Sequence, residues 1–263
     1  MKKLLFFLCF SAILLAEVEH PLLKQIAARS ELRRQYEHVC RNSSDIYEHI
    51  PVLRQLARQC SSVTEIGLRS LVSSWGIWLG LSERFQPHRS YLGIDLISPP
   101  EDRLFFAQRL VESAGISFQF WEVNDMTIDI ESTDMLFIDS LHTYCHLSYE
   151  LEKFAPKVRK YIAMHDTSEP WGDTDDSEYK GDYFEYPPEI DRTKRGLWPA
   201  VEDFLQRHPQ WKLMERRLNN HGFTILKRSN ESQWIGIEEY ASPNVGNAGI
   251  SSFKEEKASS LLP

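Results

Sequence analysis

Short apolar runs alternate with amphipathic segments along the middle of the chain, and this alternation predicts the fold. Five runs have the length and the β-branched or aromatic content of strands. They are SVTEIG (62–67), SYLGIDL (90–96), ISFQFWEVND (116–125), TDMLFIDS (133–140) and RKYIAMHDT (159–167). Apolar residues with helical spacing fill most of the intervals between them, over 70–85, 100–115 and 143–158. Such alternation requires right-handed crossovers, so we predict an α/β, doubly wound, Rossmann-like sheet with helices on both faces.

We predict helices before this alternating region and a β-hairpin after it. Helical periodicity in residues 20–59 predicts an N-terminal helical cap, assigned to 17–60. After a helical pattern at 196–209, two strand-like runs surround the NNHG turn in 211–229, which predicts a terminal antiparallel hairpin. We therefore expect one domain over 61–229 and a flexible tail over 230–263.

Residues 168–195 form a long acidic and aromatic stretch without periodicity. Loops of this length inside a domain are typically lids or binding loops. Its aromatic residues would cover an organic acceptor or tie the loop to the surface; they are Trp171, Tyr179, Tyr183, Phe184 and Tyr186. We treat Trp75, Trp78 and Trp198, which lie on predicted helices, as core residues.

The first sixteen residues have the layout of a secretory signal peptide. Lys2 and Lys3 precede an uncharged apolar run that ends at Ala16, and the run is short for a membrane span. We expect cleavage after Ala16 and export to a periplasmic, secreted or secretory-pathway location. An uncleaved anchor and a misassigned start, which would leave the protein in the cytoplasm, are the alternatives.

Charge and cysteine content exclude several classes of function. The formal net charge of −8 becomes more negative if the signal peptide is removed, and no basic run offers a surface for nucleic acid. Cys40, Cys60 and Cys145 would remain in the mature chain. An odd number without a CxxC pair indicates neither a disulfide framework nor a cysteine zinc site.

Each predicted strand ends in polar residues, and the carboxyl ends of parallel strands form the ligand-binding edge of such a sheet. These residues are Glu65, Gly67, Asp95, Asn124, Asp125, Asp139, His142, His165 and Asp166. We expect them to gather around one site.

Glycine spacing after the first strand argues against a diphosphate ligand. Gly67 would let a ligand approach main-chain N–H groups, but no GxGxxG pattern follows, and a glycine that only ends the strand is the alternative. Asp95 could accept bonds from both hydroxyls of a ribose or cap a helix. Asp125 could receive the exocyclic amine of a purine or cap a turn.

Acids at the ends of the fourth and fifth strands could share a divalent cation. Asp139 and Asp166 would repel each other without one, and His165 or water would complete the shell. His142 follows Asp139 by three residues and could act as a general base near neutral pH, although a lone histidine can also be structural.

The stretches TEIG, YLGIDL, FIDSLHTY and MHDT, followed by GLWPAVEDFL, resemble the class I S-adenosylmethionine-dependent methyltransferases. The resemblance covers roughly residues 63–228 and is strongest to the O-methyltransferase and cephalosporin hydroxylase-like branch. It implies a seven-stranded sheet with a reversed last strand. It also implies cofactor contacts from Glu65, Gly67, Asp95 and the Asn124–Asp125 pair.

For catalysis, the resemblance implies His142 as base and Asp139 with Asp166 as candidate ligands of Mg²⁺ or another divalent cation. His165 stands where metal-using relatives often place another acid. The expected activity is methyl transfer to a hydroxyl of a small molecule or sugar.

Two rival functions remain open at this point. A noncatalytic exported binding module would explain the signal peptide, because S-adenosylmethionine is made in the cytosol. An NAD-dependent oxidoreductase is opposed by the missing phosphate-binding glycines and by the terminal hairpin. The sequence does not reveal the acceptor or the oligomeric state.

Overall fold

A computed structural model describes residues 20–84, 87–177 and 185–229. The signal peptide, the tail 230–263, Tyr179, Tyr183 and Phe184 lie outside these ranges, so the predictions about them are not addressed. No helix among the described residues is long and apolar enough to cross a membrane.

The central element is a seven-stranded sheet with the order β3-β2-β1-β4-β5-β7-β6. The strands are β1 (Ser62–Ile66), β2 (Arg89–Asp95), β3 (Ile116–Glu122), β4 (Thr133–Ile138), β5 (Val158–His165), β6 (Trp211–Arg217) and β7 (Phe223–Arg228). β1 to β5 pair in parallel, and β7 pairs antiparallel with both β5 and β6. The predicted doubly wound α/β fold with a terminal antiparallel hairpin is therefore confirmed.

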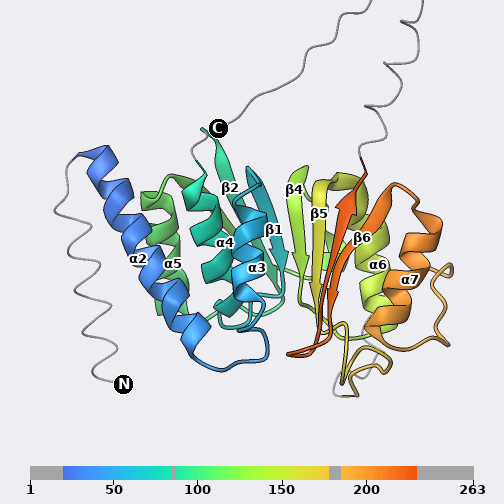
Figure 1. Cartoon of the computed structure of the whole chain (residues 1–263). Coiled ribbons are helices and arrows are strands. Elements are labelled where there is room, and N and C mark those ends of the chain that lie inside the picture. Colours follow the sequence, from blue (N-terminus) through green and yellow to red (C-terminus); the bar gives the residue numbers. More distant parts are fainter. Residues whose placement is uncertain (1–19, 85–86, 178–184, 230–263) are drawn as a thin grey trace, which may run out of the picture. The chain divides into compact units, whose positions relative to one another are not determined.

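Helices cover both faces of this sheet (Figure 1). They are α2 (Pro21–Arg41), α3 (Ile50–Ala57), α4 (Val72–Glu83), α5 (Glu101–Ser113), α6 (Tyr144–Phe154) and α7 (Leu197–Arg207). The first four share one apolar core with one sheet face, and α6 and α7 share another core with the opposite face. Leu32 of α2 and Leu53 of α3 are fully buried in the first core. α2 packs on α4 and α5, and α3 packs on α4, so both helices are part of this domain.

The β3–β4 connection differs from the other crossovers because it has no α-helix. A single 3₁₀ turn, η1 (Asp125–Thr127), takes its place. Two α6 side chains hold this turn: the Tyr149 hydroxyl donates to the Met126 carbonyl, and the Lys153 ammonium donates to the Asp125 and Met126 carbonyls. The short connection leaves the ends of β3 and β4 open to the site.

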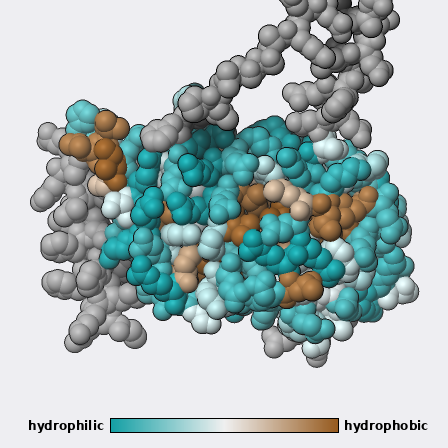
Figure 2. All heavy atoms as spheres, in the orientation of Figure 1, coloured by the Kyte–Doolittle hydropathy of each residue, from teal (hydrophilic) through white to brown (hydrophobic). Residues whose placement is uncertain are grey.

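The predicted core tryptophans are only partly core residues. Trp78 is fully buried and Trp75 nearly so, with the two rings edge to face at 4.9 Å. Trp198 is half-buried, and the Arg216 guanidinium covers its ring at 3.4 Å. The face shown in Figure 2 is mostly hydrophilic, with apolar areas in the middle and right of the view and another at the start of α2, where Leu22, Leu23 and Ile26 are exposed.

Candidate active site

A cavity of about 1530 Å³ lies at the carboxyl ends of the parallel strands. β1 lies between β2 and β4, where the strand order reverses, and ligands of doubly wound sheets bind at this position. Of the predicted site residues, six line the cavity: Gly67, Asp95, Asp125, Asp139, His142 and Asp166. The predicted convergence of strand ends on one edge is therefore found, whereas Glu65, Asn124 and His165 lie behind the lining.

His165 is buried between two carboxylates and two main-chain carbonyls. Its Nδ1 lies 3.2 Å from Asp139 Oδ1 and 3.1 Å from Asp166 Oδ2, while Nε2 lies 3.0 Å from the Asp45 carbonyl and 3.1 Å from that of Asn220. All four partners are acceptors, so both ring nitrogens must carry protons. Burial opposes the charged ring, but Asp139 and Asp166 outweigh it and raise the pKa of His165 well above its ordinary value.

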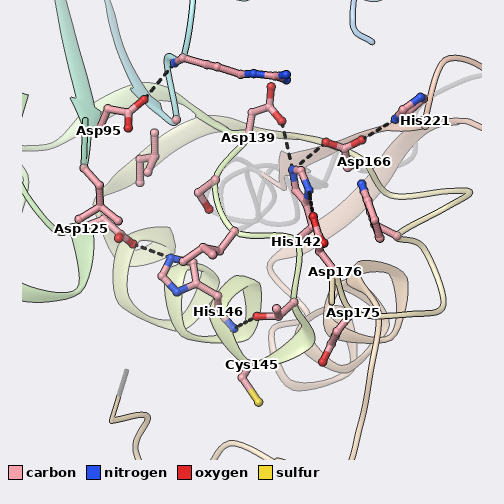
Figure 3. Close-up of a pocket in the computed structure, with 18 of the residues that line it drawn as sticks. Asp95, Asp125, Asp139, His142, Cys145, His146, Asp166, Asp175, Asp176 and His221 are labelled. Atoms are coloured by element: carbon pink, nitrogen blue, oxygen red, sulfur yellow. Dashed lines mark hydrogen bonds and ion pairs between the residues drawn. The ribbon is translucent and has the colours of Figure 1, made fainter. Parts of the chain in front are cut away.

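His142 reaches the same carboxylates from the β4–α6 loop (Figure 3). Its Nε2 lies 2.9 Å from Asp166 Oδ2 and 3.9 Å from Asp139 Oδ1, and its Nδ1 lies 3.6 Å from Asp176 Oδ2. Burial lowers the pKa of His142, but Asp139 and Asp166 more than compensate and raise it to about 10. His142 would therefore have to lose a proton before it could act as a base, and the base role stays a prediction.

The loop that carries His142 is fixed where it enters α6. Thr143 caps α6 by accepting a bond from the His146 N–H, and the Asp175 carboxylate accepts from the Tyr144 N–H at 2.8 Å. The Trp171 ring stacks on the imidazole of His142 with centroids 5.8 Å apart. These contacts hold the imidazole plane against the acids.

The same distances test whether this set of residues suits a magnesium ion. Asp139, His142 and Asp166 each offer an atom within 4.8 Å of the others, but Mg²⁺ prefers oxygen ligands in octahedral geometry. Here two imidazolium rings already neutralise the two carboxylates, and N–H groups of His142 and His165 occupy the space between the acids. The described residues therefore form a hydrogen-bonded acid–histidine network, and the ligand role of Asp139, His165 and Asp166 stays a prediction.

On the other side of the cavity, Asp95 organises the turn after β1. Its Oδ2 accepts bonds from the N–H groups of Leu68 (2.7 Å) and Arg69 (2.9 Å), and its Oδ1 accepts from the Ile97 N–H at 3.1 Å. A carboxylate has about four acceptor sites. One site on Oδ1 is left for a ligand, so Asp95 has room for one ribose hydroxyl and not for the two that were predicted.

The N–H groups of this turn are used inside the protein. Gly67 has a φ of 84° and donates its N–H to the Ile94 carbonyl at 2.9 Å. Together with the Asp95 contacts, this bond engages the first three N–H groups of the turn. The prediction that Gly67 opens main-chain N–H groups to a ligand is therefore wrong; the glycine instead allows β1 to approach β4 closely.

Glu65 is completely buried and faces the protein interior. Its carboxylate accepts bonds from the hydroxyls of Ser73 (2.5 Å), Ser74 (2.8 Å) and Tyr91. Burial raises the pKa of Glu65 to about 7 despite these bonds. Its contacts join β1, β2 and α4, so in this structure it supports the wall and does not line the cavity.

Asn124 and Asp125 follow β3 but have different surroundings. The Asn124 side chain accepts the Met126 N–H at 2.9 Å and so caps η1. Asp125 lines the cavity, yet its Oδ2 lies 3.3 Å from Nε2 of His146 on α6. The carboxylate is therefore directed at a histidine, not only at open space.

Several cavity residues were not identified from the sequence. Asp176, from the long loop, is one of them. Tyr186 of the same loop was predicted to cover an acceptor or tie the loop to the surface; it lines the cavity, and its hydroxyl lies 3.2 Å from His146 Nδ1. His221 comes from the hairpin turn and reaches Asp166 Oδ1 at 3.2 Å. The sequence did contain a signal for His146. It follows His142 by four positions, about one helical turn, at the start of the predicted helix, so both side chains are expected on the side of the cavity. The others had none, because their loops lack periodicity.

Comparison with known proteins shows similarity in three-dimensional structure alone. No protein-family model matches the chain, and no curated protein matches its sequence. One similar solved structure is the O-methyltransferase from Bacillus cereus in complex with SAH, with 12% identity, a TM-score of 0.45 and coverage of 77% of this chain and 91% of that one. Another is the O-methyltransferase TomG from Streptomyces achromogenes in complex with SAM, with 15% identity, a TM-score of 0.45 and coverage of 77% and 89%. A methyltransferase from Geobacter sulfurreducens shows 15% identity, a TM-score of 0.44 and coverage of 75% and 88%.

Proposed function

We propose that this protein is an S-adenosylmethionine-dependent methyltransferase that acts on a hydroxyl of a small molecule or sugar. One observation carries the proposal: a single cavity at the reversal of strand order has different chemistry on its two sides. Asp95 offers an acceptor site for a ribose hydroxyl on one side, and Asp139 and His142 line the other. A reaction that joins a nucleoside cofactor to a polar acceptor needs this division.

The residues of the protein would act mainly by positioning the acceptor and the cofactor relative to each other. The cofactor supplies an electrophilic sulfonium methyl group. Holding the acceptor oxygen in line with that methyl group would provide most of the rate enhancement. His142, once it has lost its own proton, would accept the hydroxyl proton as the acceptor oxygen takes the methyl group and the sulfur keeps the electron pair of its former bond to carbon.

The proposed mechanism assigns no step to a metal ion. His165 supplies, as an imidazolium, the positive charge that a cation would otherwise place between Asp139 and Asp166. A requirement for Mg²⁺ stays a prediction from the sequence, and it is tested together with cofactor binding.

Calorimetric titration of the full chain with S-adenosylmethionine and S-adenosylhomocysteine, with and without magnesium, tests the proposal. We expect micromolar binding, weakened about 10- to 100-fold in Asp95→Ala, because hydrogen bonds to charged groups contribute roughly 1.5–3 kcal/mol. Asp95→Asn separates the ligand contact from the turn, since the amide oxygen can still accept the Leu68 and Arg69 N–H bonds. Asp129→Ala, an exposed acid outside the cavity, is the matched control and should bind normally.

The noncatalytic binding module predicts a different result. Absence of binding by both nucleosides in a folded chain would reject the methyltransferase proposal and favour that module. Equal binding by wild type and Asp95→Ala would leave a nucleoside site but place it elsewhere.

We also propose export, on the basis of residues 1–16. The expected mature chain begins at Glu17, and the mass of the protein recovered outside the cytosol checks this. A recovered chain that starts at Met1 would contradict cleavage.

A further inference from the structure

A second group of titratable side chains lies in the cavity wall, apart from Asp139 and Asp166. Asp125 comes from η1, and His146 and Glu150 come from one face of α6, four residues apart. Each offers a ligand atom within 4.8 Å of the others. Their exposed fractions are 5%, 1% and 0%, so all three are buried.

The distances in this cluster suit a tetrahedral ion. Asp125 Oδ2 lies 3.3 Å and Glu150 Oε1 lies 3.8 Å from His146 Nε2. Ligands about 2.0–2.1 Å from a tetrahedral metal are separated by roughly 3.3–3.4 Å, so an ion fits after a small movement of Glu150. By contrast, Asp166 Oδ2 lies 2.9 Å from His142 Nε2 and 3.1 Å from His165 Nδ1, and these are hydrogen-bond distances.

Glu150 lacks the hydrogen bonds that a buried carboxylate requires. Ser140 donates to Oε1 at 2.7 Å, but Oε2 has no hydrogen-bond partner among the described residues. A buried polar atom left without a partner is costly, and a cation next to it would remove that cost.

We propose that Asp125, His146 and Glu150 bind a divalent transition-metal cation of the zinc type, at a site separate from the acid–histidine network. One imidazole with two carboxylates suits a borderline ion such as Zn²⁺ or Co²⁺ better than Mg²⁺. Asp125 and His146 line the cavity, which gives the ion an entry path and lets water take the fourth position.

The bound ion would fix the β3–β4 connection against α6. Tyr149 and Lys153 already bond the main chain of η1 from the same helix. A metal bridge from Asp125 to His146 and Glu150 would add a side-chain link at the point where the connection has no α-helix. This role concerns the cavity wall and does not depend on methyl transfer.

The test uses the full metal-free chain and Zn²⁺ or Co²⁺ alone, without nucleoside. Equilibrium dialysis should give one tightly bound equivalent, and Co²⁺ should show visible absorption without a thiolate charge-transfer band. Glu150→Gln and Asp125→Asn, which keep side-chain volume, should each weaken binding at least tenfold. Asp139→Asn, which alters the other cluster, is the matched control and should bind as wild type.

A thermal melt provides a second measurement if either variant folds poorly. Zn²⁺ at one hundred times its Kd should raise the wild-type midpoint by about 5–10 °C. Absence of a bound equivalent in wild type would overturn the proposal. So would binding that is lost in Asp139→Asn and kept in Glu150→Gln. Failure of the cofactor titration would leave this result unaffected, because the ion is measured alone.

Discussion

Gly67→Ala tests how β1 and β4 are brought together at the cavity. A Cβ at Gly67 would lie 2.0 Å from the Asp139 carbonyl oxygen and 2.6 Å from its carbonyl carbon. Both partners are main chain, so no side-chain rotation relieves the contact, and either the turn after β1 or the loop after β4 must move. The φ of 84° adds a conformational penalty for any residue with a Cβ.

The expected cost follows from these two effects. The positive φ costs about 1–2 kcal/mol, and forcing an extra methyl group into a packed site typically costs about 1–3 kcal/mol. A total near 3 kcal/mol would lower the midpoint of thermal unfolding by roughly 6–12 °C for a domain of this size. Because Asp139 lines the cavity, the shift should also reduce binding there.

Gly115→Ala is the matched control for the backbone effect. Its φ is 80°, but an added Cβ would meet the side-chain ends of Arg89 at 2.8 Å and Gln25 at 3.1 Å, which can move. We expect a fall of only about 3–6 °C, from the φ penalty alone. Differential scanning calorimetry of both variants measures the difference. Midpoints within 2 °C of each other would refute the claim that main-chain contact with Asp139 makes Gly67 special.

Three further predictions concern the acid–histidine network. His142→Ala should leave cofactor binding nearly intact and reduce methyl transfer about 10²- to 10⁴-fold in a single-turnover assay; unchanged turnover would remove His142 from the mechanism. The wild-type transfer rate should increase with pH towards about 10, because His142 must lose its proton, and a profile that is level from pH 7 upward would contradict this. The pKa values of His142 and His165 are higher in the folded state than the value of about 6.5 in the unfolded chain, so protonation of these rings stabilises the fold. This stabilisation is complete below about pH 6.5 and is lost as the pH increases through the folded-state pKa values. The thermal midpoint should therefore fall between pH 7 and 10, and less steeply in Asp166→Asn; equal slopes would argue against the linkage.

Cysteine chemistry does not add a second pH response of this kind near neutrality. The three described cysteines, Cys40, Cys60 and Cys145, are unpaired thiols, as the sequence indicated. Burial raises the pKa of Cys60 to about 12, and burial also raises that of the other two. Their thiols therefore do not ionise near neutral pH.

The sequence by itself determined the order of elements and the edge of the sheet that carries the chemistry. Apolar runs such as 133–138 are buried on both sides, so their composition predicts a central strand without knowledge of their neighbours. Because parallel strands share their direction, a polar residue that follows one run must lie at the same edge as those that follow the others. Gly67, Asp95, Asp139 and Asp166 could be placed for this reason.

Only the tertiary structure decided what these side chains contact. Glu65 is the second-last residue of β1 and lies in register with Gly93, whereas Asp95 is the last residue of β2. The Glu65 side chain is therefore still inside the sheet layer, where the Tyr91 hydroxyl donates to it, and does not reach the strand end. His165 is the positive charge between two acids because its Nε2 donates to the carbonyls of Asp45 and Asn220, so that Nδ1 faces the acids. These carbonyls lie 120 and 55 residues away in the chain. Contacts between aperiodic segments that lie so far apart in the chain leave no local sequence pattern. The protonation states of the histidines and the cluster of Asp125, His146 and Glu150 can therefore be recognised only in the folded chain.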